Sequence, residues 1–265
     1  MSKIIIYTII FLGVILGYVK YIELRAVFFP TREIEFNPSV INLSFEDIWI
    51  NTSDNLKINA WFIPYNDARY CLLFLHGNAG NIGNRLDKIQ LLRQAKVNIL
   101  IIDYRGYGRS EGQPFEKGLY LDAQAAYNYL VNDLKIKPEQ IILYGESLGT
   151  AVAVNLASEI KVRAVILEGA FSKGRDMAKR SYPFLPAPLF SNKFDSLAKV
   201  KKINAPKLFM HSQEDEIVPF DLAQKLYDAA NEPKQLVALI GGHNSAFLDS
   251  QEIYVSSINL FIERL

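Results

Sequence analysis

Six short runs of apolar residues constrain the fold of this chain more than any other feature. Strands buried on both faces read as continuous apolar runs, whereas half-exposed strands alternate apolar and polar residues. Longer amphipathic segments separate these runs, and this order predicts an α/β fold with a mostly parallel central sheet and helices on both faces. The predicted strands are residues 70–75, 97–102, 140–144, 164–167, 207–210 and 235–240, and the predicted helices are residues 81–95, 116–133, 148–160, 219–230 and 250–264.

Two segments depart from this pattern. Residues 43–50 and 56–63 alternate apolar and polar side chains around the turn residues 51–55, which predicts an N-terminal antiparallel hairpin. Residues 171–205, between the fourth and fifth runs, contain a stretch at 182–190 that is too rich in proline for one regular helix. We expect this segment to form a small cap insert.

Composition sets the domain count and excludes some partners. Half of the 265 residues are apolar, which is enough for one large core, so we predict a single domain over residues 43–265. The net charge is +1 without a polybasic tract, so nucleic acid is not an expected partner. The single cysteine, Cys71, excludes an intrachain disulfide, and its apolar run predicts a buried strand thiol.

The N-terminal segment is long and uncharged. Residues 4–19 carry no charge between Lys3 and Lys20. A helix of about 20 residues crosses ~30 Å of hydrocarbon, and a terminal lysine can reach back to the interface. A cleaved signal peptide would need a small-x-small site after the apolar core, and none follows here. We therefore predict a single-pass membrane anchor over residues 1–22, with residues 23–42 as a connector; basic residues on both flanks leave its orientation open.

The sharpest motif is Gly145-Glu-Ser-Leu-Gly149, which matches the G-x-S-x-G nucleophile elbow between a predicted strand and a predicted helix. A serine on such a tight turn needs small neighbours, which the two glycines supply. The N-terminus of the following helix offers a dipole and a free N–H to developing negative charge. The pattern predicts Ser147 as a nucleophile.

A serine hydroxyl needs a base, and the chain has three histidines. In G-x-S-x-G enzymes the base follows the nucleophile, which leaves His211 and His243. His243 lies in a glycine-rich loop after the last apolar run, where the ends of parallel strands meet, so it is the predicted base. His211 directly follows a strand and is the weaker candidate, whereas His76 is expected to brace its own loop.

The acid should follow a strand between the serine and the base. Asp215 is predicted to hold the tautomer of His243 and to stabilise its charged form. The alternative is that Asp215 caps a helix beginning near Pro219. For the oxyanion hole, the N–H groups of Asn78 and Leu148 are predicted donors, because the first lies in a His-Gly loop after a strand and the second follows the serine.

The glycine-rich loop at residues 103–112 loosely resembles a phosphate-binding loop. It lacks the Gly-Lys-Ser/Thr ending, so we expect a turn packed beside the elbow. No group of histidine, cysteine and acidic residues has the spacing of metal ligands, and no metal or cofactor is expected.

Together these motifs resemble those of membrane-anchored α/β-hydrolase-domain serine hydrolases of the bud-emergence-protein-like subgroup. Relatives of that subgroup include lysophospholipid lipases and protein depalmitoylases, so the resemblance implies acyl-ester or thioester hydrolysis. The depalmitoylase branch has an N-terminal cysteine cluster that this chain lacks. The resemblance runs from about Phe28 to the C-terminus and includes Phe29-Pro-Thr-Arg32, Ala60-Trp-Phe-Ile-Pro64, His76-Gly-Asn-Ala-Gly-Asn81, residues 103–112, the elbow, Arg175-Asp-Met-Ala-Lys179, and Tyr182-Pro-Phe-Leu-Pro186.

The leading hypothesis is a serine hydrolase of the α/β-hydrolase fold that cleaves lipid-like or lysophospholipid carboxylic esters near a membrane. The apolar cap supplies the expected substrate contacts, namely Tyr182, Phe184 and Leu185. The alternatives are an acyl-protein thioesterase or peptidase, and an inactive membrane-tethered scaffold. The filled nucleophile, acid and base positions argue against the scaffold.

Overall fold

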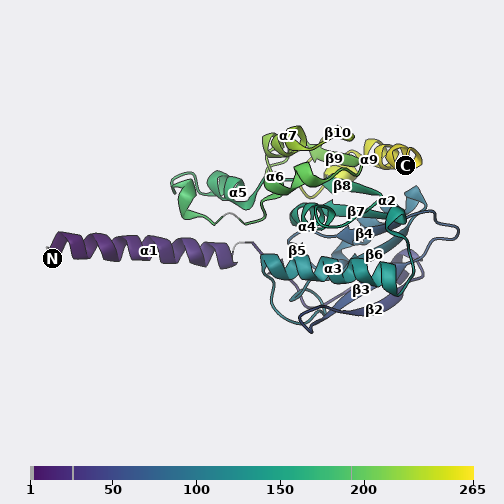
Figure 1. Ribbon diagram of the computed structural model, residues 1–265, viewed down its shortest axis with the longest axis horizontal. Helices are drawn as coiled ribbons and strands as arrows, with labels where there is room; N and C mark the ends of the chain where they lie inside the picture. The colour runs from purple at the N-terminus through teal and green to yellow at the C-terminus, as the bar shows by residue number, and fades with distance from the viewer. Residues whose placement is uncertain (1–2, 26, 192) are drawn as a thin grey trace.

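The computed structural model describes residues 3–25, 27–191 and 193–265. Its centre is an eight-stranded sheet, and every apolar run predicted as a strand forms one (Figure 1). In spatial order the strands are β10 (Lys234–Leu239), β9 (Lys207–Ser212), β8 (Ala164–Glu168), β7 (Ile141–Glu146), β4 (Cys71–Leu75), β6 (Asn98–Ile102), β3 (Lys57–Ile63) and β2 (Glu46–Asn51).

The pairing confirms the predicted mostly parallel sheet and its antiparallel start. Strands β10 to β4 and the β4–β6 pair are parallel, whereas β3 pairs antiparallel with both β2 and β6. Ile50 faces Ile58 across the predicted hairpin. Asn55 turns the chain with a φ of 64°, a left-handed conformation that asparagine tolerates better than most residues.

Two apolar cores lie on the two faces of the sheet. In β4, Leu73 packs into one core and Leu72 into the other, because successive side chains of a strand point to opposite faces. This explains why the central strands have no polar alternation. One core contains side chains from α3 (Glu116–Asn132), α4 (Leu148–Ala157) and α7 (Phe220–Ala229), and the other contains side chains from α2 (Leu86–Leu92), α8 (Ala246–Asp249) and α9 (Gln251–Glu263).

Shorter elements connect this framework. Two short strands, β1 (Phe29–Pro30) and β5 (Ala79–Gly80), pair in parallel and join the connector to the His-Gly loop. The segment predicted as a cap contains helices α5 (Gly174–Ser181) and α6 (Ser196–Lys199) in place of one regular helix. The 3₁₀ turns are η1 (Pro38–Ile41), η2 (Ile82–Arg85), η3 (Arg93–Ala95), η4 (Pro138–Gln140), η5 (Ala187–Leu189) and η6 (Val200–Lys202).

The N-terminal segment forms a single helix, α1 (Lys3–Arg25), which extends away from the sheet on the same side of the molecule as α5 (Figure 1). Most of its described apolar side chains are exposed. Within the described part of the chain, no helix is both long and apolar enough to cross a membrane, so the predicted single-pass anchor is not confirmed. Residues 1–2 of the predicted anchor, residue 26 of the connector and residue 192 of the cap lie outside the described residues.

Candidate active site

Ser147 lies between the end of β7 and the start of α4, at the sharp turn that the sequence predicts. Its φ of 49° and ψ of −114° are unfavourable for a residue with a side chain, at a cost on the order of 1–3 kcal/mol. The Ser147 N–H donates a 2.8 Å hydrogen bond to the carbonyl oxygen of Glu168 at the end of β8. A Cβ at Gly145 would lie 2.6 Å from the Gly149 oxygen, and one at Gly149 would lie 2.8 Å from the His76 oxygen. The turn therefore requires both glycines.

Three side chains from separate loops form one hydrogen-bonded row at this turn. His243 Nε2 lies 2.9 Å from Ser147 Oγ, and His243 Nδ1 lies 2.7 Å from Asp215 Oδ2. The second oxygen of Asp215 accepts hydrogen bonds from the N–H groups of Ile217 and Val218, at 3.0 and 2.7 Å. This arrangement can remove a proton from Ser147 and stabilise the positive charge that forms on the imidazole.

The surroundings of Asp215 favour its ionised form. Burial alone would raise the pKa of this carboxyl, but the hydrogen bond from His243 and the N–H of Val218 outweigh it and hold the pKa below its ordinary value. The side chain does not cap a helix, because the following helix, α7, has Pro219 at its N-cap and no side-chain capping bond. The sequence left this alternative open, and the hydrogen bond to His243 favours the role of acid.

Two acidic residues that the sequence did not single out hold the histidine loop. Glu214 accepts a 2.8 Å hydrogen bond from the N–H of Gly241, and Glu216 accepts a 2.9 Å hydrogen bond from the N–H of His243. The loop after β9 therefore holds the backbone of the loop after β10 on both sides of Asp215. Only their position beside the acid could have indicated this role.

The other two histidines lie outside the hydrogen-bonded row. His211 is buried, with Nε2 2.7 Å from the Val218 oxygen and 3.4 Å from Asp215 Oδ2. Burial lowers the pKa of His211, which favours a neutral ring that supports the acid loop. His76 is also buried, and its Nδ1 lies 2.7 Å from the Gly77 oxygen, so it contacts its own loop as expected.

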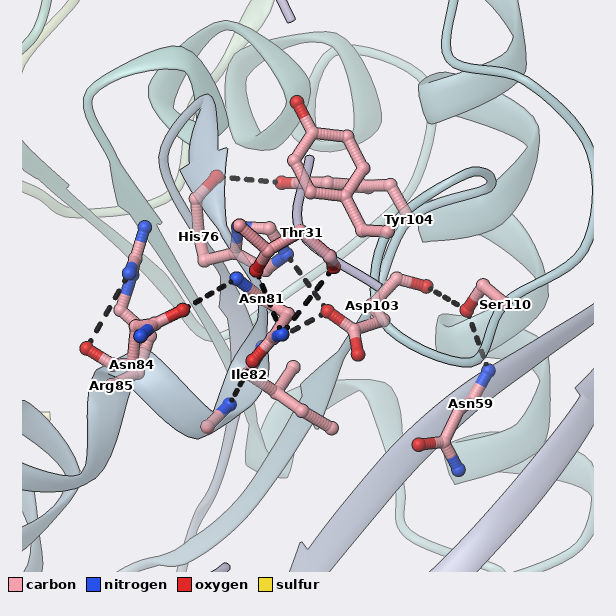
Figure 2. Close-up of polar contacts among 12 residues, drawn as sticks. Thr31, Asn59, His76, Asn81, Ile82, Asn84, Arg85, Asp103, Tyr104 and Ser110 are labelled. Atoms are coloured by element: carbon pink, nitrogen blue, oxygen red, sulfur yellow. Dashed lines mark hydrogen bonds and ion pairs between the residues drawn. The ribbon is translucent and has the colours of Figure 1, made fainter. Parts of the chain in front are cut away.

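Hydrogen bonds fix the His-Gly loop from several directions (Figure 2). The hydroxyl of Tyr104 donates to the His76 oxygen at 3.2 Å, so the glycine-rich segment at 103–112 packs against this loop. The Asn81 amide donates to Thr31 Oγ1 at 2.9 Å, and the N–H of Ile82 donates to Asp103 Oδ1 at 2.9 Å. The loop is therefore set before any substrate binds.

Two backbone N–H groups beside Ser147 are free to bind an oxyanion. Neither the N–H of Asn78 nor that of Leu148 donates a hydrogen bond to any other described residue. Both residues line the same cavity as Ser147 and His243. Both N–H groups are therefore available as the oxyanion donors that the sequence predicts.

Comparisons with known proteins identify the family. Residues 70–187 match the family model of the alpha/beta hydrolase fold. The chain is 33% identical over 253 residues to protein bem46 of Schizosaccharomyces pombe, across 90% of this chain and 79% of that protein. It is 34% identical over 228 residues to alpha/beta hydrolase domain-containing protein 17B of Homo sapiens, across 83% of this chain and 76% of that protein. The chain belongs to the α/β-hydrolase family.

A solved structure agrees with this assignment. An esterase of Pyrococcus furiosus superposes on this α/β-hydrolase with a TM-score of 0.76 and 22% identity, over 89% of this chain and 98% of that chain. At that identity the likeness shows the fold alone. The likeness to bem46 and to protein 17B confirms the predicted bud-emergence-like subgroup, and the fold and the relatives together support a hydrolase.

A cavity of about 570 Å³ opens beside the Ser147 hydroxyl of this α/β-hydrolase. Of the predicted substrate contacts, Tyr182 lines it, but Phe184 is 96% exposed and neither Phe184 nor Leu185 is among the lining residues. Periodicity did not indicate the apolar residues that do line it. Besides Ala79 and Leu148, these are Val27 and Phe29 from the connector, Phe171, Met177, Ala178, Phe190 and Phe194 from the cap, and Ile217 and Val218 from the acid loop.

Across residues 3–25, 27–191 and 193–265, no group of three or more histidine, cysteine and acidic side chains is arranged to hold a metal ion.

Proposed function

We propose that this α/β-hydrolase is a serine hydrolase that cleaves carboxylic esters of apolar acyl chains. The observation that carries the proposal is the hydrogen-bonded row from Ser147 through His243 to Asp215, which ends at the mouth of the apolar cavity. The strained elbow presents the hydroxyl to that cavity. Two free N–H groups flank it.

In the proposed mechanism, Ser147 Oγ attacks the ester carbonyl carbon while His243 Nε2 takes the hydroxyl proton. The carbonyl oxygen becomes an oxyanion and accepts hydrogen bonds from the N–H groups of Asn78 and Leu148. The intermediate collapses, the bond to the leaving oxygen breaks, and His243 gives its proton to that oxygen. An alcohol leaves, and the acyl group stays on Ser147.

Water completes the cycle. It attacks the acyl carbon while His243 takes one of its protons, and the acyl–serine bond then breaks. The serine oxygen regains the proton from His243, and a carboxylic acid is released. Throughout, the Asp215 carboxylate accepts a hydrogen bond from the Nδ1–H group of His243 and stabilises the charged imidazole.

The shape and position of the cavity support a lipid-like substrate. Its walls are mainly apolar and come from the cap, from the acid loop, and from Val27 and Phe29 shortly after α1. The exposed apolar side chains of α1 support attachment of the domain to a lipid surface. An acyl chain leaving that surface would enter the cavity from the side on which α1 lies.

A fluorophosphonate probe tests the chemistry directly. We expect it to label the wild type and to leave Ser147→Ala unlabelled, with loss of p-nitrophenyl ester hydrolysis in the same variant. Equal labelling of both proteins would rule out Ser147 as the nucleophile. A series from acetate to palmitate, extended to lysophospholipids and to thioesters, tests the substrate class. An absence of turnover across the whole series would favour the inactive scaffold.

A further inference from the structure

A cluster of four charged side chains lies next to the nucleophile elbow. Lys88 Nζ donates 2.7 Å hydrogen bonds to both Glu146 Oε1 and Glu168 Oε1. Arg85 Nε donates a 2.7 Å hydrogen bond to Glu146 Oε2. The cluster is neutral overall, and Lys88 is only 4% exposed. Lysine and glutamate are rarely buried unless they are paired, and here Lys88 has two carboxylate partners.

Each carboxylate of the cluster belongs to a segment that shapes the site. Glu146 is the last residue of β7 and directly precedes Ser147. Glu168 is the last residue of β8, and its backbone oxygen accepts the hydrogen bond from the Ser147 N–H. Lys88 therefore ties together the two strand ends between which the elbow is held.

The same cluster reaches the loop that carries one free N–H group. The N–H of Gly77 donates a 3.1 Å hydrogen bond to Glu146 Oε2. On the other side of Gly77, its carbonyl oxygen is held by His76 Nδ1 at 2.7 Å. A trans peptide is planar, so the N–H of Asn78 points opposite to that oxygen. Glycine has no side chain to restrict its backbone, so these two hydrogen bonds hold the peptide that carries the Asn78 N–H.

We propose that Glu146 is a positioning residue, which fixes the backbone of Gly77 relative to Ser147 and thereby aims the Asn78 N–H at the substrate carbonyl oxygen. This inference rests on the proposed function, because it concerns the oxyanion of that reaction.

A carboxylate next to a developing oxyanion must be neutralised. Burial alone would raise the pKa of Glu146, but Arg85 and Lys88 hold it far below its ordinary value. Burial alone would lower the pKa of Lys88, but the two carboxylates raise it. Both groups therefore stay charged and compensate each other, so Glu146 can hold the Gly77 N–H without repelling the oxyanion.

Two charge-matched double variants isolate the hydrogen bond to Gly77. Both E146Q/K88M and E146L/K88M remove one negative and one positive charge. Only glutamine keeps an acceptor for the Gly77 N–H. We would measure kcat for p-nitrophenyl butyrate and divide it by the number of sites that the fluorophosphonate labels at completion. This per-site kcat should be lower by about tenfold or more in E146L/K88M than in E146Q/K88M, because a misdirected N–H donor stabilises the transition state less.

Two further readouts separate positioning from general damage. KM should differ by less than about threefold between the two variants, because the donor acts mainly in the transition state, and binding of a trifluoromethyl ketone should weaken in parallel with kcat. D47N/R109M is the matched control, since it also removes one negative and one positive charge, from the exposed Arg109–Asp47 pair at the β2 edge of the sheet. Its per-site kcat should stay within twofold of the wild type.

Equal per-site kcat in the two double variants would overturn the proposal. If the leucine variant does not fold, amide hydrogen exchange in the wild type decides: the Gly77 N–H should exchange slowly, and exchange at the rate of an unprotected loop amide would also overturn it. Failure of the wild type to hydrolyse esters, with labelling unaffected by Ser147→Ala, would instead refute the proposed function.

Discussion

Gly149→Ala should disable the site while leaving the fold intact. The added methyl carbon would lie 2.6 Å from the Leu75 carbonyl carbon and 2.8 Å from the His76 oxygen, and closer still to the Leu75 oxygen, whereas ordinary contacts begin at 3.4 Å. These neighbours are backbone atoms at the end of β4, so α4 and the His-Gly loop must separate by roughly 1 Å in a close-packed interior. That separation moves Ser147 and Leu148 away from Asn78.

The expected losses follow from this displacement. A misplacement of about 1 Å costs on the order of 10²-fold in rate, and overpacking costs about 1–3 kcal/mol of unfolding free energy. We would measure per-site kcat/KM with p-nitrophenyl butyrate and stability by urea unfolding. The control is Gly13→Ala, where the added carbon meets no atom within 4 Å. A Gly149→Ala enzyme with kcat/KM within threefold of the wild type would refute the steric reasoning.

Three further predictions concern the acid, the cavity and α1. Asp215→Asn should lower kcat by about 10⁴-fold. Because the pKa of this carboxyl in the folded protein lies below its ordinary 3.8, the stability from this shift is complete above about pH 4 and is lost as the pH falls. The difference in unfolding free energy between wild type and variant, measured in urea, should therefore shrink from pH 7 to pH 3, and a constant difference would contradict this. Ala178 lines the cavity, so the larger side chain of Ala178→Trp should occupy part of it and lower kcat/KM for p-nitrophenyl decanoate by about tenfold or more, without changing kcat/KM for p-nitrophenyl acetate. Lys179 is exposed, and Lys179→Trp should leave kcat/KM for both esters unchanged. The full chain should float with phosphatidylcholine–phosphatidylglycerol vesicles, and replacing the exposed Phe11 and Val14 by glutamate should abolish flotation without changing soluble-ester turnover; continued flotation would show that α1 does not mediate it.

The sheet could be predicted from the sequence because burial on two faces leaves a local trace. Runs such as Cys71–Leu75 have no polar positions, and the alternation around residues 51–55 identifies the hairpin. The proximity of Ser147, Asp215 and His243 follows from the same reasoning, because each lies just after a predicted parallel strand.

Features that depend on packing between distant segments could not be predicted. Lys88 lies on an amphipathic helix, where periodicity favours a solvent-facing lysine, and its burial depends on the distant carboxylates at the ends of β7 and β8 and on the ring of Phe247. Phe184 was expected to contact substrate because of its apolar neighbours, but the direction of a proline-rich loop has no periodic signal, and the ring faces solvent. The roles of Glu214 and Glu216 likewise depend on a loop that lies more than twenty residues further along the chain.

Ser147, Asp215 and His243 lie far apart in the sequence, and this affects when the proposed triad can form during folding. Ser147 and His243 are 96 residues apart and follow different strands, so the proposed proton transfer between them requires that the β10 edge of the sheet has docked. Contacts between residues so distant in sequence form slowly, because much chain entropy is lost before they contribute. A nascent chain in which β10 and the His243 loop have not yet folded therefore lacks the proposed base beside Ser147. During synthesis, the proposed triad cannot form until β10 and the His243 loop have left the ribosome.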